Sequence, residues 1–157
     1  MAQHVDIGTV RRTITVAISQ QRAFEVFTAE FGTWWPKEYS ISEAGMADFV
    51  LEPKVGGRWY EVGADGQECD TGRVTAFEPP ARVILAWHLN DRFEYDPDPA
   101  HASEVEVRFI VEDTSRTRVE LEHRGFERHG AGGQGVHDGV DQGWSYCLEQ
   151  FSRQAAV

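Results

Sequence analysis

The sequence predicts an α+β fold in which a curved antiparallel β-sheet wraps around a long C-terminal helix, with two short helices after the first strand. Residues 49–89 read as short strands separated by glycine and proline turns. Residues 104–123 hold two further strands, in which apolar side chains alternate with charged ones. An apolar helical stripe closes the chain, and an antiparallel sheet with one apolar face needs such a cover.

Length and charge limit the classes of protein and partner. A chain of 157 residues suits one domain, spanning residues 1–157. The net charge of −11 repels phosphate backbones and anionic lipid, so we expect neither a nucleic-acid nor a membrane partner. Cys69 and Cys147 lack the paired spacing of redox or zinc sites, and the N-terminus lacks a secretion signal. We therefore expect a cytoplasmic location.

The first strand and two helices are predicted from residues 10–36. Residues 10–18 alternate between apolar and polar side chains, as in a strand with one buried face. Ser19 stands at the N-cap position of a helix from about Gln20 to Phe31, which Gly32 is expected to end. A second helix is predicted to begin at residues 33–36. It is expected to be short, because Pro36 limits its continuation.

A meander of strands follows. Phe49 and Leu51 open it, and its later strands are predicted at residues 58–62, 71–77 and 83–89. The turns between the strands are marked by Gly56-Gly57, residues 63–66 and Pro79-Pro80.

The last two strands show which face of the sheet is buried. Residues 90–102 form the longest predicted loop, and a strand follows at residues 104–111. A turn at residues 113–116 leads to a strand at residues 117–123 in the same phase. One face of the sheet is therefore expected to be apolar and the other charged and wet.

The C-terminal helix is predicted over residues 136–155, after a glycine-rich loop at residues 125–135. A helix of ~20 residues spans ~30 Å, enough to cross the concave face of the sheet. Gly143 lies inside this helix, where glycine costs about 1 kcal/mol relative to alanine, so we expect it to mark close packing. The expected apolar stripe comprises Val140, Trp144, Cys147, Leu148 and Phe151.

Several local motifs, in this order, resemble a known superfamily. They are Val55-Gly-Gly-Arg-Trp59, the strand from Gly72 to Pro80, Leu121-Glu-His-Arg-Gly-Phe126 and Gly143-Trp144. Together they resemble the SRPBCC (START-like) superfamily, whose architecture is the helix-grip fold. Within it, residues 10–156 look most similar to the branch related to the C-terminal domain of the activator of the heat-shock protein 90 ATPase.

This resemblance implies a cavity between sheet and helix, because one helix laid over a curved sheet does not fill the space beneath it. The superfamily includes lipid carriers, hormone receptors and polyketide cyclases, so the resemblance does not select one ligand. Tryptophan suits the lining of such a cavity, and core filling is the alternative role. The predicted ligand-binding tryptophans are Trp34 and Trp35 near the mouth, Trp59 and Trp87 on strands, and Trp144 on the helix.

His123 shares the phase of the buried positions on its strand, so we expect its imidazole to face the cavity and contact a ligand. The alternative is a strand-end histidine bonded to backbone or to a tyrosine. In an enzyme, His123 would act with Glu61 or Tyr60 as general acid or base. The alternative role of Glu61 is that of a solvated strand carboxylate.

The leading functional prediction is a small cytosolic protein that binds an apolar or amphipathic small molecule between sheet and helix. We expect no cofactor and no metal, because the histidines lack ligand spacing such as HxH or HxxxH. Two alternatives stay open. One is a cavity enzyme of the cyclase or hydratase type, and the other is a co-chaperone-like protein-interaction module, including a homodimer.

Overall fold

The structure, a computed structural model, describes residues 7–157. Its helices are α1 (Gln20–Thr28), α2 (Phe31–Trp34) and α3 (Gly133–Ala155). Its strands are β1 (Val10–Val16), β2 (Met46–Leu51), β3 (Arg58–Gly63), β4 (Glu68–Glu78), β5 (Arg82–Trp87), β6 (Ser103–Asp113) and β7 (Arg116–Arg124). Within this range no helix has the length and apolar character needed to cross a membrane.

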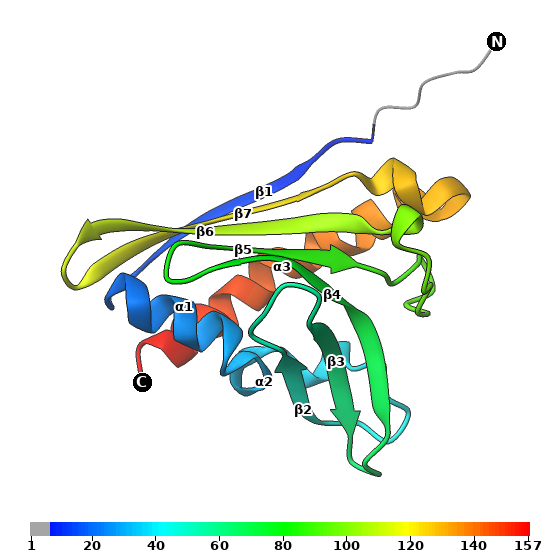
Figure 1. Cartoon of the computed structure of the whole chain (residues 1–157), viewed down its shortest axis with the longest axis horizontal. Helices are drawn as coiled ribbons and strands as arrows, with labels where there is room; N and C mark the ends of the chain where they lie inside the picture. Colours follow the sequence, from blue (N-terminus) through cyan, green and yellow to red (C-terminus); the bar gives the residue numbers. More distant parts are fainter. Residues whose placement is uncertain (1–6) are drawn as a thin grey trace.

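The strands form one antiparallel sheet in the order β1-β7-β6-β5-β4-β3-β2. The sheet is curled, so that β2 and β3 turn away from the plane of β5–β7, and α3 crosses the inner face (Figure 1). This is the helix-grip arrangement predicted from the sequence. The predicted phase is also confirmed, because Val107 lies opposite Leu121 and Phe109 opposite Val119, all buried.

The apolar stripe of α3 packs on this inner face. All five predicted stripe residues are at most 6% exposed. Phe151 near the end of α3 meets Phe27 of α1, with ring centroids 5.4 Å apart. The core therefore lies between the curled sheet and α3, and α1 closes it at the C-terminal end of α3 (Figure 1).

The helices after β1 differ from the prediction in their boundaries. Ser19 caps α1 as expected, since its Oγ accepts a hydrogen bond from the backbone N–H of Arg22 at 3.2 Å. However, α1 ends at Thr28, and α2 begins at Phe31 and contains Gly32. A Cβ on Gly32 would lie 2.7 Å from the backbone nitrogen of Phe49, so this glycine permits α2 to pack on β2 and does not end the first helix.

The glycine-rich segment before α3 is also more ordered than the sequence suggests. Residues predicted as a loop form the 3₁₀ helix η3 (Phe126–Gly132), and α3 starts three residues earlier than expected. A Cβ on Gly133 would lie 2.4 Å from the carbonyl oxygen of Phe126. Gly133 therefore serves close packing of η3 against α3.

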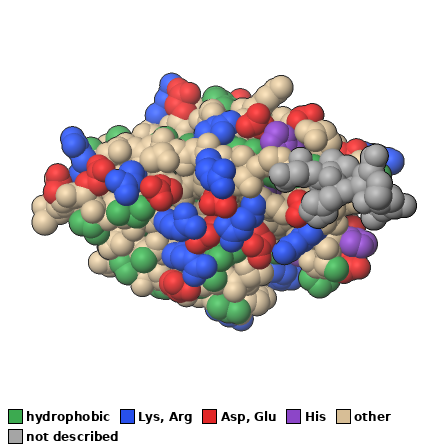
Figure 2. All heavy atoms as spheres, turned by 90° about the horizontal axis from the view of Figure 1, so that it is seen from above, with side chains coloured by type: hydrophobic (Ala, Val, Ile, Leu, Met, Phe, Trp, Pro, Cys, Tyr) green, Lys and Arg blue, Asp and Glu red, His purple; other side chains and the backbone are tan. Residues whose placement is uncertain are grey.

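The outer face of the sheet carries a network of ion pairs centred on Glu106 of β6. Figure 2 shows basic and acidic side chains alternating over the middle of this face. The Glu106 carboxylate lies 2.6 Å from Arg82 and 2.7 Å from Arg124, and it also bonds Arg108 at 3.0 Å. Glu106 is only 5% exposed, so this part of the face is less wet than predicted.

These arginines set the ionisation of Glu106. Burial alone would raise the pKa of this carboxyl group, but hydrogen bonds from Arg82 and Arg124 and the charge of Arg108 lower it from 4.5 to about 2. The carboxylate therefore stays ionised well below the pH at which an ordinary glutamate takes up a proton.

Candidate functional site

A cavity of about 510 Å³ lies between the sheet and α3. Its walls come from the segment after α2, from β2 to β5, from the loop after β5 and from α3. The lining residues are Trp35, Glu38, Tyr39, Ser40, Ile41, Phe49, Glu61, Thr71, Trp87, Leu89, Arg92, Phe93, Gly139, Val140, Gln142, Gly143, Trp144 and Cys147.

Three of the predicted ligand-binding tryptophans line this cavity: Trp35, Trp87 and Trp144. The ring centroids of Trp35 and Trp144 are 5.7 Å apart, and those of Trp87 and Trp144 are 6.1 Å apart, both in edge-to-face geometry. Strand β5, helix α3 and the end of α2 thus together present a continuous aromatic wall.

The structure places the other predicted site residues behind this wall. Trp34 lies in the core, not at the mouth, and its Nε1–H donates to the carbonyl oxygen of Val26 at 2.9 Å. Trp59 is fully buried and packs against Phe31 and Phe49. Neither tryptophan lines the cavity, and His123 does not line it either.

His123 is fully buried at the end of β7 and is bonded on both ring nitrogens. The Nε1–H of Trp144 donates to His123 Nδ1 at 3.1 Å, so the proton of the neutral ring belongs on Nε2. That Nε2–H faces Ser103 Oγ at 2.8 Å, and Ser103 Oγ in turn lies 2.8 Å from Nε2 of His129. The imidazole therefore orients Trp144 from behind rather than facing the cavity.

Burial and the nearby His129 and His137 hold the pKa of His123 well below its ordinary 6.5. The unfolded chain takes up a proton near pH 6.5 and the folded chain does not. We therefore expect His123 to make the free energy of unfolding fall by about 1.4 kcal/mol for each pH unit below 6.5. Urea unfolding between pH 5 and 8 measures this slope, which His123→Gln should reduce.

His101→Gln is the matched control for the pH experiment. A hydrogen bond to Asp96, together with the charge of Asp98, raises the pKa of His101. This exposed histidine contributes stability that is fully present below pH 6.5 and is lost as pH rises through its folded pKa, so its removal should steepen the decline on acidification. Equal slopes in the wild type and in His123→Gln would contradict the assignment.

Glu61 is the buried carboxylate of the cavity. It is 1% exposed, not solvated. One oxygen accepts from the backbone N–H of Ile41 at 3.0 Å, and the other accepts from the hydroxyl of Ser40 and, at 3.4 Å, from the N–H of Ser42. The segment after α2 thus holds Glu61 at the cavity wall.

The expected partners of Glu61 are not brought together with it. His123 bonds Ser103 and Trp144, four strands away from β3 in the sheet. Tyr60 alternates with Glu61 along β3 and lies under the guanidinium of Arg58, which is 4.0 Å from its ring centroid. Of the three acid–base candidates, only Glu61 reaches the cavity.

Thr71 is a cavity residue that the sequence does not reveal. Trp59 of β3 lies opposite Gly72, whereas Tyr60 lies opposite Asp70, so Thr71 is an extra residue in β4 without an opposite neighbour. Such a β-bulge re-aims a side chain, and here the 2%-exposed Thr71 lines the cavity.

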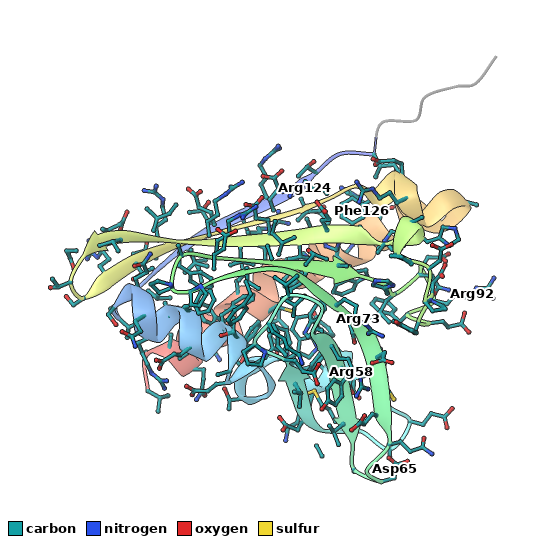
Figure 3. The ribbon with its side chains drawn as sticks, in the orientation of Figure 1. Arg58, Asp65, Arg73, Arg92, Arg124 and Phe126 are labelled. Carbon is teal, nitrogen blue, oxygen red and sulfur yellow. The ribbon has the colours of Figure 1, made fainter. Side chains whose placement is uncertain are left out.

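The cavity mouth is bordered by aromatic side chains and by glycines of α3. Phe93, half exposed, has a φ of 59°, which non-glycine residues rarely adopt. Its ring lies 3.8 Å from a Cβ placed on Gly139, and Tyr39 lies 3.7 Å from a Cβ placed on Gly143. Gly143 therefore keeps space open and does not mark the close packing predicted for it. Arg92 lies at the outer end of the same loop as Phe93 (Figure 3).

The chemistry available at the site is that of hydrogen bonding and proton transfer. Within residues 7–157, no group of three or more histidine, cysteine or acidic residues is placed to hold a metal ion. Burial raises the pKa of Cys147 far above its ordinary value, so its thiol stays protonated and is a poor nucleophile near neutral pH.

Among the solved structures similar to this chain are two with more than 30% sequence identity. One is described as the anthrahydroquino-γ-pyrone synthase Txn09 and was solved as a complex. It is 38% identical, with a TM-score of 0.62 and coverage of 86% of this chain and 88% of that chain. The other is described as the self-sacrificing resistance protein CalC from Micromonospora echinospora, which is 33% identical, with a TM-score of 0.70 and coverage of 94% and 93%.

A more distant structure shares the fold alone. It is the Aha1 dimer from Colwellia psychrerythraea, with 14% identity, a TM-score of 0.64 and coverage of 93% of this chain and 94% of that chain. No curated protein sequence matches the chain. Residues 17–155, nearly the whole chain, match the family described as "Activator of Hsp90 ATPase homolog 1-like protein". The chain therefore belongs to this family, within the SRPBCC superfamily.

Proposed function

We propose that this protein binds a planar, amphipathic aromatic small molecule in the cavity between the sheet and α3. The observation that carries the proposal is the aromatic wall of Trp35, Trp87 and Trp144 around a space of about 510 Å³. Small-molecule sites typically enclose about 300–1,000 Å³ and combine apolar walls with a few polar groups. Faces and edges of indole rings favour an aromatic guest over a flexible aliphatic one.

The name of one relative above 30% identity supports the aromatic class of ligand. The name of the synthase refers to a fused aromatic ring system joined to a pyrone. In this chain, Gly139 and Gly143 lie one helical turn apart on α3, and both line the cavity without a side chain that would project into it. A flat ring system fits against such a helix surface better than a branched one.

Filling the cavity from α3 tests the proposal. Gly143→Leu adds a side chain that enters the cavity without a backbone clash, because a Cβ there makes only an ordinary contact with Tyr39. We expect this variant to bind 1,8-dihydroxyanthraquinone at least about 10-fold more weakly than the wild type. The measurement is quenching of tryptophan fluorescence, since three tryptophans line the site.

Gly143→Ala is the matched control. Its methyl group occupies little of the cavity, so binding should stay close to that of the wild type. The free energy of unfolding should rise by about 0.5–1 kcal/mol, because alanine is favoured over glycine inside a helix. Unchanged affinity in Gly143→Leu would place the ligand elsewhere. A wild type that binds no fused aromatic compound would favour the protein-interaction alternative.

Ring-closing catalysis in the same cavity is the second candidate function. It is favoured by the position of Glu61, a buried carboxylate at the cavity wall, and by the 38% identity to a synthase. A carboxylate held there can remove a proton next to a ligand carbonyl. In that case Glu61→Gln lowers turnover of an aromatic polyketide substrate far more than it lowers affinity, whereas a pure binding protein shows no turnover before or after the substitution.

A further inference from the structure

We propose that the cavity recognises the hydroxyl-and-ketone edge of its aromatic ligand: a carbonyl oxygen accepts from Thr71 Oγ1 and Trp87 Nε1, and a ligand hydroxyl donates to Glu61. This inference rests on the proposed function and specifies the ligand class further. Its basis is a set of polar groups that the protein itself leaves without partners.

Two unpaired donors belong to the cavity lining. Within residues 7–157, the buried side-chain nitrogen and oxygen atoms without a hydrogen-bond partner are Trp59 Nε1, Thr71 Oγ1 and Trp87 Nε1. Thr71 is 2% exposed and Trp87 is 3% exposed, and both line the cavity. Folded proteins pair the great majority of such atoms, so two unpaired donors in one cavity wall indicate a partner that arrives with the ligand.

The backbone places Thr71 and Trp87 close together on neighbouring strands. Gly72, next to Thr71, lies opposite Trp87 in the sheet. The backbone N–H of His88, which follows Trp87, donates to the carbonyl oxygen of Thr71 at 2.9 Å. This bond ties the bulge of β4 to the end of β5 and fixes the hydroxyl and the indole N–H on neighbouring strands.

The bulge itself depends on the glycine that follows Thr71. A Cβ on Gly72 would lie 1.8 Å from the carbonyl oxygen of Ala86. Only glycine therefore permits this close approach, and the bulge turns the Thr71 side chain into the cavity.

A donor pair and a carboxylate together select a class of ligand. The two lone pairs of a ketone or quinone oxygen match the hydroxyl of Thr71 and the indole N–H of Trp87. Glu61 accepts hydrogen bonds and carries a negative charge when ionised, so it favours a phenolic or enolic hydroxyl and disfavours a carboxylate ligand. A hydrocarbon leaves all of these groups unpaired. The site therefore fits hydroxylated aromatic ketones and quinones rather than fatty acids or unsubstituted aromatics.

The experiment compares two probes on two variants. Thr71→Val removes the hydroxyl donor and conserves the shape of the side chain. Trp87→Phe removes the indole N–H donor and retains an aromatic ring. Each should lower the preference for 1-hydroxyanthraquinone over anthracene, taken as the ratio of the two affinities, by roughly 5- to 10-fold, as measured by fluorescence quenching. Without ligand, Thr71→Val should not lose stability and should raise Tm by up to about 2–4 °C, because it removes an unpaired buried hydroxyl.

Two control variants each remove a hydroxyl or an indole N–H that already has a hydrogen-bond partner in the protein. Thr75→Val lies on the same strand but outside the cavity, and its hydroxyl bonds the carbonyl oxygen of Ile84. Trp34→Phe removes an indole N–H that already bonds Val26, so it should lower Tm and spare selectivity between the probes.

The outcomes separate this inference from the proposed function. Wild-type preference for 1-hydroxyanthraquinone over anthracene that disappears in Thr71→Val and Trp87→Phe supports the inference. If the two variants lose affinity for both probes equally, or keep the wild-type affinity for 1-hydroxyanthraquinone, the inference is overturned and the proposal of an aromatic-binding cavity stands. If the wild type binds neither probe, both the inference and the proposed function are overturned.

Discussion

Replacing Gly72 with alanine is expected to lower the free energy of unfolding by more than about 3 kcal/mol, or to prevent folding altogether. The added Cβ would lie 1.8 Å from the carbonyl oxygen of Ala86 and 3.3 Å from the Trp59 ring. Both are fixed, one by the ladder between β4 and β5 and the other by the core. The clash is therefore relieved only by separating the two strands. Urea unfolding followed by circular dichroism measures the loss.

Gly139→Ala is the control for this substitution. The nearest atom to a Cβ on Gly139 is Phe93 Cζ at 3.8 Å, an ordinary contact, so this variant should fold at least as stably as the wild type. Wild-type stability in Gly72→Ala would mean that the bulge is not held as tightly as its geometry indicates.

Glu106→Gln is expected to cost about 2 kcal/mol of folding free energy at pH 7. A pKa lowered from 4.5 to about 2 corresponds to about 3 kcal/mol of preferential stabilisation of the carboxylate, which the partly exposed arginines reduce by screening. Glutamine retains the size and an acceptor oxygen but leaves Arg82, Arg108 and Arg124 without their shared charge. Chemical denaturation of both proteins at pH 7 gives the difference.

The pH dependence of that difference identifies its cause. The folded pKa is lowered, so the stabilisation is fully present above about pH 4.5 and is lost as pH falls through about 2. The gap between wild type and Glu106→Gln should therefore narrow on acidification. Glu120→Gln, which removes a half-exposed partner of Arg118, should cost less than about 0.5 kcal/mol throughout. A gap for Glu106→Gln that is constant with pH would point to packing instead of charge.

The sheet and the long helix could be predicted because their signals are local. Alternation in residues 104–123 fixed both the strands and their buried face, and the helical stripe around Trp144 fixed the face of α3. The predicted helix boundaries were wrong where a glycine permits close packing between two elements. Gly32 and Gly133 meet the backbone of Phe49 and of Phe126, and such contacts carry no local signal.

The candidate site could be predicted only in part for the same reason. Trp35, Trp87 and Trp144 were predicted from the tryptophan content and from the cavity that the resemblance implies, and the structure places them at the cavity wall. Whether they bind a ligand stays a prediction. Thr71 could not be found, because strand alternation gives no indication of a bulge that depends on the register of two neighbouring strands. The position of Glu61 at the cavity wall could not be predicted, because the sequence does not show which face of β3 is buried.

The unpaired donors of the cavity also bear on how this sequence drifts. A lineage selected for stability alone gains by exchanging Thr71 for valine, since the hydroxyl of Thr71 is not satisfied within the described chain. This exchange conserves the shape of the side chain and so leaves the wall of the cavity unchanged. We therefore expect Thr71 to persist only where selection acts on a complex rather than on the folded chain by itself, and copies freed from that selection should accumulate valine at this position first.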